Sequence, residues 1–167
     1  MVDVINPDWI DVPQHKPTFV KIKNSKIHGK GAFALKNIKK GTFLGHYMGI
    51  IYPKYVTGDY VFHSYRETQE TQKDELFSIC ASDLKKSNWT RYMNCCSPDK
   101  KNENVESSRL TNKELYQLGT QKPKSIEGYI VFYAKRDIKK GEELLYYYGD
   151  DYSKLLNCQP TAGERQG

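Results

Sequence analysis

The chain has 167 residues, the length of one domain, and such a chain buries about 70% of its unfolded surface without needing disulfides or metal ions. Its 38% hydrophobic and 28% charged residues are typical of a globular protein and argue against wholesale disorder. The net charge of +6 favours a polyanionic partner, such as nucleic acid.

Several classes of protein are excluded by simple patterns. No apolar run approaches the roughly 20 residues that span a bilayer. The first residues, MVDVINPDWIDVP, carry acids where a signal peptide needs basic residues and an apolar core. The four cysteines include no CxxC pair, so neither a disulfide framework nor a metal site is expected. We therefore expect an intracellular protein without a membrane partner.

The charges are unevenly distributed along the chain. From Lys16 to Lys40 there are eight lysines and no acid. Residues 59–75 contain five acids and two basic residues, and residues 142–151 contain four acids and no base. This distribution favours one basic and one acidic face, although charges scattered over solvated strand edges are an open alternative.

The predicted elements are short strands separated by turns. Alternating or β-branched segments predict strands at residues 18–23, 32–35, 43–52, 59–64, 76–80, 105–110, 129–135 and 143–147. Gly45 and Gly49 interrupt the third of these, where bulges or close backbone approach are expected. Short helices are predicted at 111–118 and 150–157, and residues 158–167 are expected to be disordered. The fold class is therefore β-rich α+β, and no internal repeat stands out.

Four motifs follow one another in a specific order. They are GKGAFA at residues 29–34, KKGTFLGHYMG at 39–49, SNWTRYMNCCS at 87–97 and KKGEELLYYYGDDY at 139–152. Each is weak alone, because an isolated GxG is usually only a tight turn. Together they resemble the SET domain of protein lysine methyltransferases, most closely the PR-type branch and compact viral-like members. The resemblance places a SET domain at residues 18–157, after a flank at 1–17. It implies small curved sheets with a C-terminal pseudoknot, a rare threaded topology.

The resemblance also implies S-adenosylmethionine as cofactor and assigns residues to it. The matching positions are Lys30, Gly31, Ala32, Tyr47, Arg91, Asn94 and Cys95. Glycines suit the GxG because backbone must approach the ligand closely. The amide of Asn94 can bond to the methionine end of the cofactor, and the backbone of Cys95 matches the adenine position.

Three tyrosines match the catalytic channel of the family. Tyr148 corresponds to the tyrosine at the methyl-transfer pore, and Tyr60 is expected to line the lysine channel. A lysine amine has a pKa of about 10.4, and burial beside a sulfonium lowers that pKa to give a nucleophile. Tyr146 occupies the family's Phe/Tyr switch, where tyrosine implies mono- or dimethylation.

The sequence also departs from the family pattern. Cys95 and Cys96 stand where His and Ser are usual, His46 where an acid is common, and Tyr147 replaces an Asp. These changes bear on activity more than on fold. The leading interpretation is a methyltransferase of histone tails in the nucleus, whose acidic stretches receive the basic tail. The Lys16 to Lys40 run either attracts the carboxylate of the cofactor or lies against nucleosomal DNA. The alternatives are a non-catalytic SET-type module that binds chromatin or partner proteins, and a nucleic-acid-binding β protein.

Overall fold

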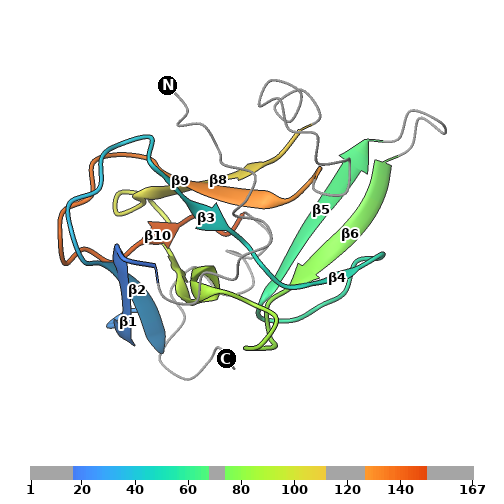
Figure 1. The fold of residues 1–167 in the computed structure, drawn as a ribbon, viewed down its shortest axis with the longest axis horizontal. Helices are drawn as coiled ribbons and strands as arrows, with labels where there is room; N and C mark the ends of the chain where they lie inside the picture. The colour runs from blue at the N-terminus through green and yellow to red at the C-terminus, as the bar shows by residue number, and fades with distance from the viewer. Residues whose placement is uncertain (1–16, 68–73, 112–126, 150–167) are drawn as a thin grey trace.

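The computed structural model describes residues 17–67, 74–111 and 127–149, which form four small β-sheets and one short 3-10 helix (Figure 1). In order of hydrogen-bonded neighbours, the sheets are β1 (Val20–Asn24) with β2 (Lys30–Ala34); β3 (Phe43–His46), β9 (Ile130–Ala134) and β8 (Val105–Arg109); β4 (Ile50–Tyr52), β6 (Asp74–Cys80) and β5 (Val61–Glu67); and β7 (Asn94–Cys95) with β10 (Leu145–Tyr146). Within these described ranges, no helix is long and apolar enough to cross a membrane.

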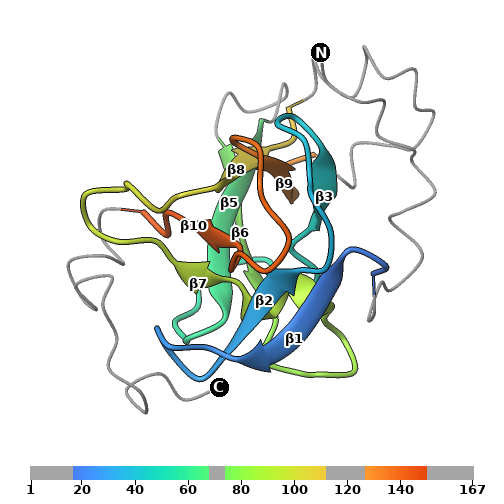
Figure 2. The same cartoon turned by 90° about the vertical axis from the view of Figure 1, so that its left-hand side faces the viewer.

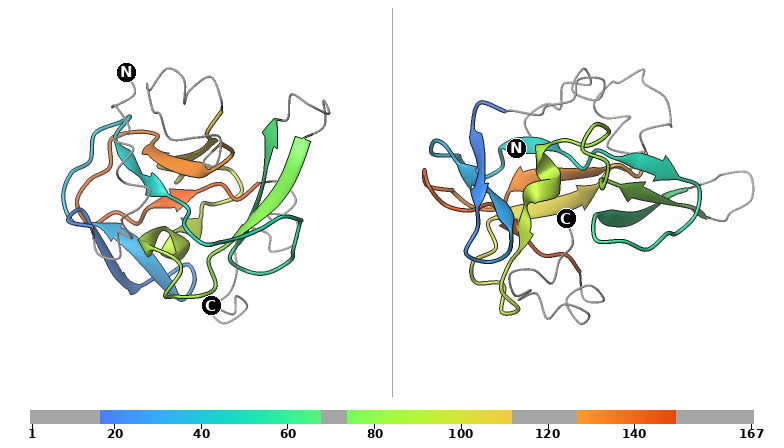
Figure 3. Two further views of the ribbon diagram at one scale, coloured as in Figure 1. Left: turned by 45° about the vertical axis from the view of Figure 1, so that its right-hand side comes forward. Right: turned by 90° about the horizontal axis from the view of Figure 1, so that it is seen from below.

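The sheets are arranged around a shared core. The β1–β2 hairpin lies at one end of the molecule and the β4–β6–β5 sheet at the other, with β3–β9–β8 and β7–β10 between them (Figures 1 and 3). β9 is paired on both sides, by β3 and β8, and four of its five residues are buried. Its Phe132 packs in the same core as Phe77 of β6 and Trp89 of the 3-10 helix. Burial of these large side chains is what holds the small sheets together.

The 3-10 helix, η2 (Trp89–Tyr92), is anchored by a buried asparagine. The Asn88 side chain accepts a hydrogen bond from the Thr90 backbone N–H, which caps the helix. The same side chain donates to the carbonyl of His46 at 2.9 Å. Asn88 therefore ties the helix to the end of β3 and sets its position in the core.

The predicted strands correspond closely to the observed ones, with one instructive difference. The segment predicted at 43–52 is split into β3 and β4 by residues 47–49, and a register shift between Phe43 and Gly45 lies within β3. A Cβ at Gly49 would lie 2.3 Å from the carbonyl oxygen of Cys80, so the two backbones meet closely there. The sequence did not predict β7 or the 3-10 helix, which are too short for a periodic signal. The helices predicted at 111–118 and 150–157 and the tail at 158–167 lie outside the described residues, as does nearly all of the flank.

Two turns 100 residues apart in sequence are interlocked with two-fold symmetry. The Ile38 and Ile138 backbones exchange N–H···O bonds of 2.8 Å in both directions. Gly41 donates to the carbonyl of Ala134 and Gly141 to that of Ala34, each at 2.8 Å. Both glycines have positive φ, 86° and 94°, which explains why glycine ends each turn. The two turns also share the tetrapeptide IKKG, at 38–41 and 138–141, a similarity too short to be an internal repeat.

The C-terminal segment passes between two earlier parts of the chain. On one side β10 pairs in parallel with β7, and the Cys96 N–H donates to Tyr146 O at 3.0 Å (Figure 2). On the other side, the Asn104 side chain donates to Glu143 O and accepts from Leu145 N–H, both at 2.8 Å. The loop from β7 to Asn104 thus encloses residues 143–146, and the threaded SET topology is confirmed.

Candidate active site

A pocket of about 420 Å³ opens where the β1–β2 turn meets the 3-10 helix. Its lining residues come from four places in the sequence: His28, Gly29, Lys30, Tyr60, Ser82, Leu84, Arg91, Tyr92 and Asn94. A volume of several hundred Å³ is typical of small-molecule sites. The fold therefore brings the predicted residues Lys30, Tyr60, Arg91 and Asn94 to one pocket.

Asn94 is the central polar side chain of this wall. It is 2% exposed, and its Nδ2 lies 3.0 Å from His28 O, 3.2 Å from Lys30 O and 2.9 Å from Glu143 Oε1. Two amide hydrogens are thus shared among three acceptors. Asn94 holds the GxG turn against the pocket through backbone carbonyls, and the same nitrogen reaches the C-terminal motif.

Glu143 is a site residue that the sequence reasoning missed. One carboxylate oxygen accepts from Asn94, and the other accepts from Ser25 Oγ at 2.9 Å. Gly31 leaves room for this carboxylate, because a Cβ at Gly31 would lie 2.1 Å from Glu143 Oε1. Gly31 and Ala32 are buried in β2 behind the pocket, and the Ala32 carbonyl accepts from Leu144 N–H at 2.8 Å. The two acids of the GEEL motif were the available sequence signal for Glu143, but the spacing of residues could not predict its partners Asn94 and Ser25.

Arg91 supports the opposite wall of the pocket. Its Nε donates to Ala81 O at 2.8 Å, and its guanidinium lies 4.1 Å from the ring centroid of Tyr60 and 4.9 Å from that of Tyr92. The side chain is only 7% exposed, so these stacked contacts are largely shielded from water. Arg91 therefore fixes the orientation of Tyr60 at the pocket.

Tyr146 and Tyr148 form a pair next to the pocket wall. Their ring centroids are 4.7 Å apart, and Tyr146 also packs against Phe132 at 4.9 Å. The Tyr148 hydroxyl donates to Met93 O at 2.5 Å. Because Met93 lies between the pocket residues Tyr92 and Asn94, this bond places the hydroxyl of Tyr148 beside the wall that Asn94 forms.

The remaining predicted residues, Tyr47 and Cys95, lie behind the pocket. Tyr47 is 5% exposed, packs against Phe62 with centroids 5.2 Å apart, and donates its hydroxyl to Tyr60 O at 2.8 Å. Cys95 is 2% exposed, and its backbone pairs with Tyr146 in the β7–β10 sheet. Both residues support the neighbours that line the site.

His46, which stands where the family often has an acid, is held neutral. Burial lowers its pKa from 6.5 to about 4. Its ring stacks on Tyr129 with centroids 6.3 Å apart, and its carbonyl accepts from the Asn88 and Thr90 side chains. An uncharged imidazole therefore replaces a carboxylate at the edge of the core.

Comparison with solved structures agrees with this fold. The methyltransferase domain of human PR domain-containing protein 2 superposes with a TM-score of 0.58 at 24% identity, covering 81% of each chain. ATXR5 in complex with histone H3.1 mono-methylated on R26 gives a TM-score of 0.59 at 20% identity, over 78% of this chain and 56% of that one. KRYPTONITE in complex with mCHG DNA and SAH gives 0.55 at 19% identity, over 78% of this chain and 23% of that one.

No curated protein matches the sequence. The SET domain family itself matches residues 29–149, which contain all four motifs up to Gly149. That match covers well over half of the 167 residues, and the threaded β7–β10 pair lies inside it. The chain therefore belongs to the SET-domain family.

Proposed function

We propose that this protein is an S-adenosylmethionine-dependent protein lysine N-methyltransferase. One observation carries the proposal: Tyr148 and Asn94, 54 residues apart, meet at one wall. The Tyr148 hydroxyl bonds to Met93 O, the carbonyl that precedes Asn94 in the chain, and the buried Asn94 lines the pocket. Methyl transfer requires the groups that align the lysine amine and those that bind the cofactor to lie close together.

The pocket suits the proposed cofactor in size and chemistry. Its volume of about 420 Å³ fits a nucleoside with an amino-acid chain, and Lys30 and Arg91 supply positive charge for a carboxylate. When bound, S-adenosylmethionine supplies an activated methyl group. We propose that Lys30, Arg91 and Asn94 contact it directly. Gly31, Ala32, Tyr47 and Cys95 would act through backbone groups or by supporting the pocket wall.

The tyrosines would prepare the substrate lysine. An apolar channel lined by Tyr148, Tyr146 and Tyr60 disfavours the ammonium form, so the lysine enters the reaction as a free amine after losing its proton to water. Aromatic faces and ring hydroxyls would then align the amine. Tyr146 is 4% exposed and packed on three aromatic rings, Phe62, Phe132 and Tyr148, so little space remains beside it. This crowding supports the proposal of mono- or dimethylation.

We propose a histone tail as substrate and the nucleus as location. Support comes from structures of similar fold that carry histone H3, and from exposed acids at the β5–β6 end, where Glu67 lies opposite Asp74. In the other acidic stretch, residues 142–151, the two acids that the structure describes are already engaged. Glu142 is paired with Arg136, and Glu143 is bonded to Ser25 and Asn94. Of these four acids, Glu67 and Asp74 therefore support the proposal, whereas Asp150 and Asp151 lie outside the described residues.

The alternative is a non-catalytic module that binds partners through the same groove. Its support is the Cys95–Cys96 pair in place of His and Ser, both at most 2% exposed. An assay with labelled cofactor and a histone mixture distinguishes the methyltransferase from the non-catalytic module, with the Tyr148→Phe variant as a comparison. We expect methyl transfer by the native protein and a loss of at least 100-fold in Tyr148→Phe. Tyr55→Phe, the same change at a half-exposed tyrosine, should leave the rate unchanged.

Titration calorimetry measures cofactor binding independently of methyl transfer. Cofactor binding without methyl transfer would support the module, since the pocket would then be intact without chemistry. Absence of both cofactor binding and methyl transfer would contradict the proposal that the protein is an enzyme.

A further inference from the structure

The interlocked turns, residues 36–42 and 136–142, gather basic side chains that are far apart in sequence; they are termed here the paired lysine turns. The cations that they carry are Lys36, Lys39, Lys40, Arg136, Lys139 and Lys140. The five lysines are all exposed, and Arg136 is partly buried. None of these residues lines the pocket, so the surface is separate from the candidate active site.

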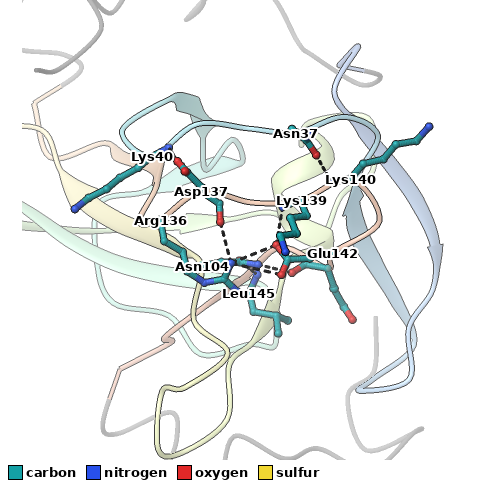
Figure 4. A network of polar contacts seen from close by, with 10 residues as sticks. Asn37, Lys40, Asn104, Arg136, Asp137, Lys139, Lys140, Glu142 and Leu145 are labelled. Carbon is teal, nitrogen blue, oxygen red and sulfur yellow. Dashed lines mark hydrogen bonds and ion pairs between the residues drawn. The ribbon is translucent and has the colours of Figure 1, made fainter.

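The backbone that carries these lysines is held in place from both sides (Figure 4). The Lys40 N–H donates to Asp137 Oδ1 at 2.8 Å, and the Lys140 N–H donates to Asn37 Oδ1 at 2.9 Å. Figure 4 shows the Lys40 and Lys140 side chains extending in opposite directions from this network. The two-fold pairing therefore presents lysines on a fixed base over a broad surface.

The acids in the same turns are engaged within the network. Asp137 accepts from the Lys40 backbone, and Glu142 accepts from the Lys139 N–H at 2.7 Å and pairs with Arg136 at 3.2 Å. Among the described residues, none of the five lysine ammonium groups is paired with a carboxylate. Counting six cations against these two acids leaves a local charge of about +4 at this surface.

The composition of the turns indicates the kind of polyanion that they fit. Their apolar residues, Ile38 and Ile138, are 5% and 1% exposed, so nothing in the turns can insert into a lipid bilayer. Neither turn contains an aromatic residue on which a single-stranded base could stack. Exposed lysines without apolar or aromatic partners are suited to phosphates of an intact duplex.

We infer that the paired lysine turns bind the phosphate backbone of double-stranded DNA, independently of sequence. The basic run from Lys16 to Lys40 is therefore divided between two surfaces. Lys21, Lys23 and Lys30 belong to the β1–β2 hairpin, whereas Lys39 and Lys40 belong to a surface completed by Lys139 and Lys140. DNA binding at this surface needs neither the cofactor nor the lysine channel, so its test is separate from that of the methyltransferase.

The experiment compares two variants of equal charge. The turn variant carries Lys39→Gln, Lys40→Gln, Lys139→Gln and Lys140→Gln; the control carries Lys54→Gln, Lys85→Gln, Lys86→Gln and Lys101→Gln, all exposed lysines elsewhere. Both reduce the net charge from +6 to +2, since each removes four positive charges. Fluorescence anisotropy with a labelled 24-base-pair duplex, at several salt concentrations and without cofactor, measures affinity.

We expect the native protein to bind with steep salt dependence. The turn variant should lose about 10- to 100-fold in affinity at low salt, and the slope of log K against log salt should become shallower by up to about 3.6, because each of four lost phosphate contacts contributes about 0.9. The control should change affinity only about twofold. Equal losses in both variants, or no duplex binding by the native protein, would overturn the proposal, as would binding of phosphatidylserine vesicles in preference to duplex. A turn variant with all four lysines changed to Arg keeps the charge and should bind like the native protein, which separates charge loss from misfolding.

Discussion

Asn94 and Glu143 are joined by a hydrogen bond of 2.9 Å across 49 residues of sequence. It links the asparagine motif to the C-terminal motif at the place where the C-terminal segment is threaded. Because the second carboxylate oxygen accepts from Ser25 Oγ, the same side chain also holds the β1–β2 hairpin. The orientation of the Asn94 amide at the pocket therefore depends on the threaded segment being in place.

Replacing Glu143 should weaken cofactor binding more than it slows the chemistry. Glu143→Leu removes a charge-assisted acceptor from the buried Asn94 amide, an interaction of about 1.5–3 kcal/mol. Because the amide keeps His28 O and Lys30 O as acceptors, part of this energy reaches cofactor binding, and we expect about a 10-fold rise in cofactor Kd. Glu143→Gln keeps one acceptor oxygen and should show only a few-fold rise. Calorimetry measures the cofactor Kd, and separate values of kcat and KM show whether binding or the chemical step has changed. Glu106→Leu, at an exposed glutamate of β8, is the control. An unchanged Kd in folded Glu143→Leu contradicts the positioning role.

The contact between Gly31 and Glu143 should appear as a specific coupling. A Cβ at Gly31 would lie 2.1 Å from Oε1 and 2.9 Å from Cδ of Glu143, so Gly31→Ala must displace the carboxylate. We expect a destabilisation of about 1–3 kcal/mol in urea unfolding, typical of overpacking. Combined with Glu143→Ala, the same substitution should cost much less, because the clashing side chain is gone. Strictly additive effects of the two changes would show that the contact is not responsible.

Much of the fold could be predicted from the sequence, but pairings between distant segments could not. Alternation predicted β1, and segments of similar texture between turn residues predicted β5, β6, β8 and β9, each of which has at least five residues. β7 has two residues and is defined only by its partner β10, which no local pattern reveals. The motif order placed Asn94 and Tyr148 near a cofactor, whereas Glu143 appeared only as surface acid. Its role, like the Ile38–Ile138 pairing, depends on long-range contacts.

Tyr146→Phe should raise the number of methyl groups transferred. The ring is enclosed by Phe62, Phe132 and Tyr148, so removing the hydroxyl creates space within an otherwise fixed aromatic wall. We expect a shift from mono- or dimethyl toward di- and trimethyl products, with less than tenfold change in overall rate. Mass spectrometry of product peptides measures the distribution. Dominant trimethylation by the native protein would contradict the prediction, and Tyr133→Phe, at a ring packed on Phe43, serves as control.

Stability should fall on acidification because of His46. Burial lowers the pKa of His46 from 6.5 to about 4, so between these values the unfolded state binds more protons than the folded state. The contribution of the neutral imidazole is complete above about pH 6.5 and is lost as pH falls toward 4, by roughly 3 kcal/mol in total. Glu142 adds a separate loss of stability at lower pH. Partial burial opposes ionisation of its carboxyl, but the hydrogen bond from the Lys139 N–H and the charge of Arg136 outweigh burial and hold the pKa of the carboxyl below its usual value. Urea unfolding at pH 7, 6, 5 and 4.5 measures the dependence. In His46→Gln the slope between pH 6.5 and 4.5 should largely disappear, even if the variant is less stable at pH 7; an unaltered slope would assign the acid sensitivity to other groups.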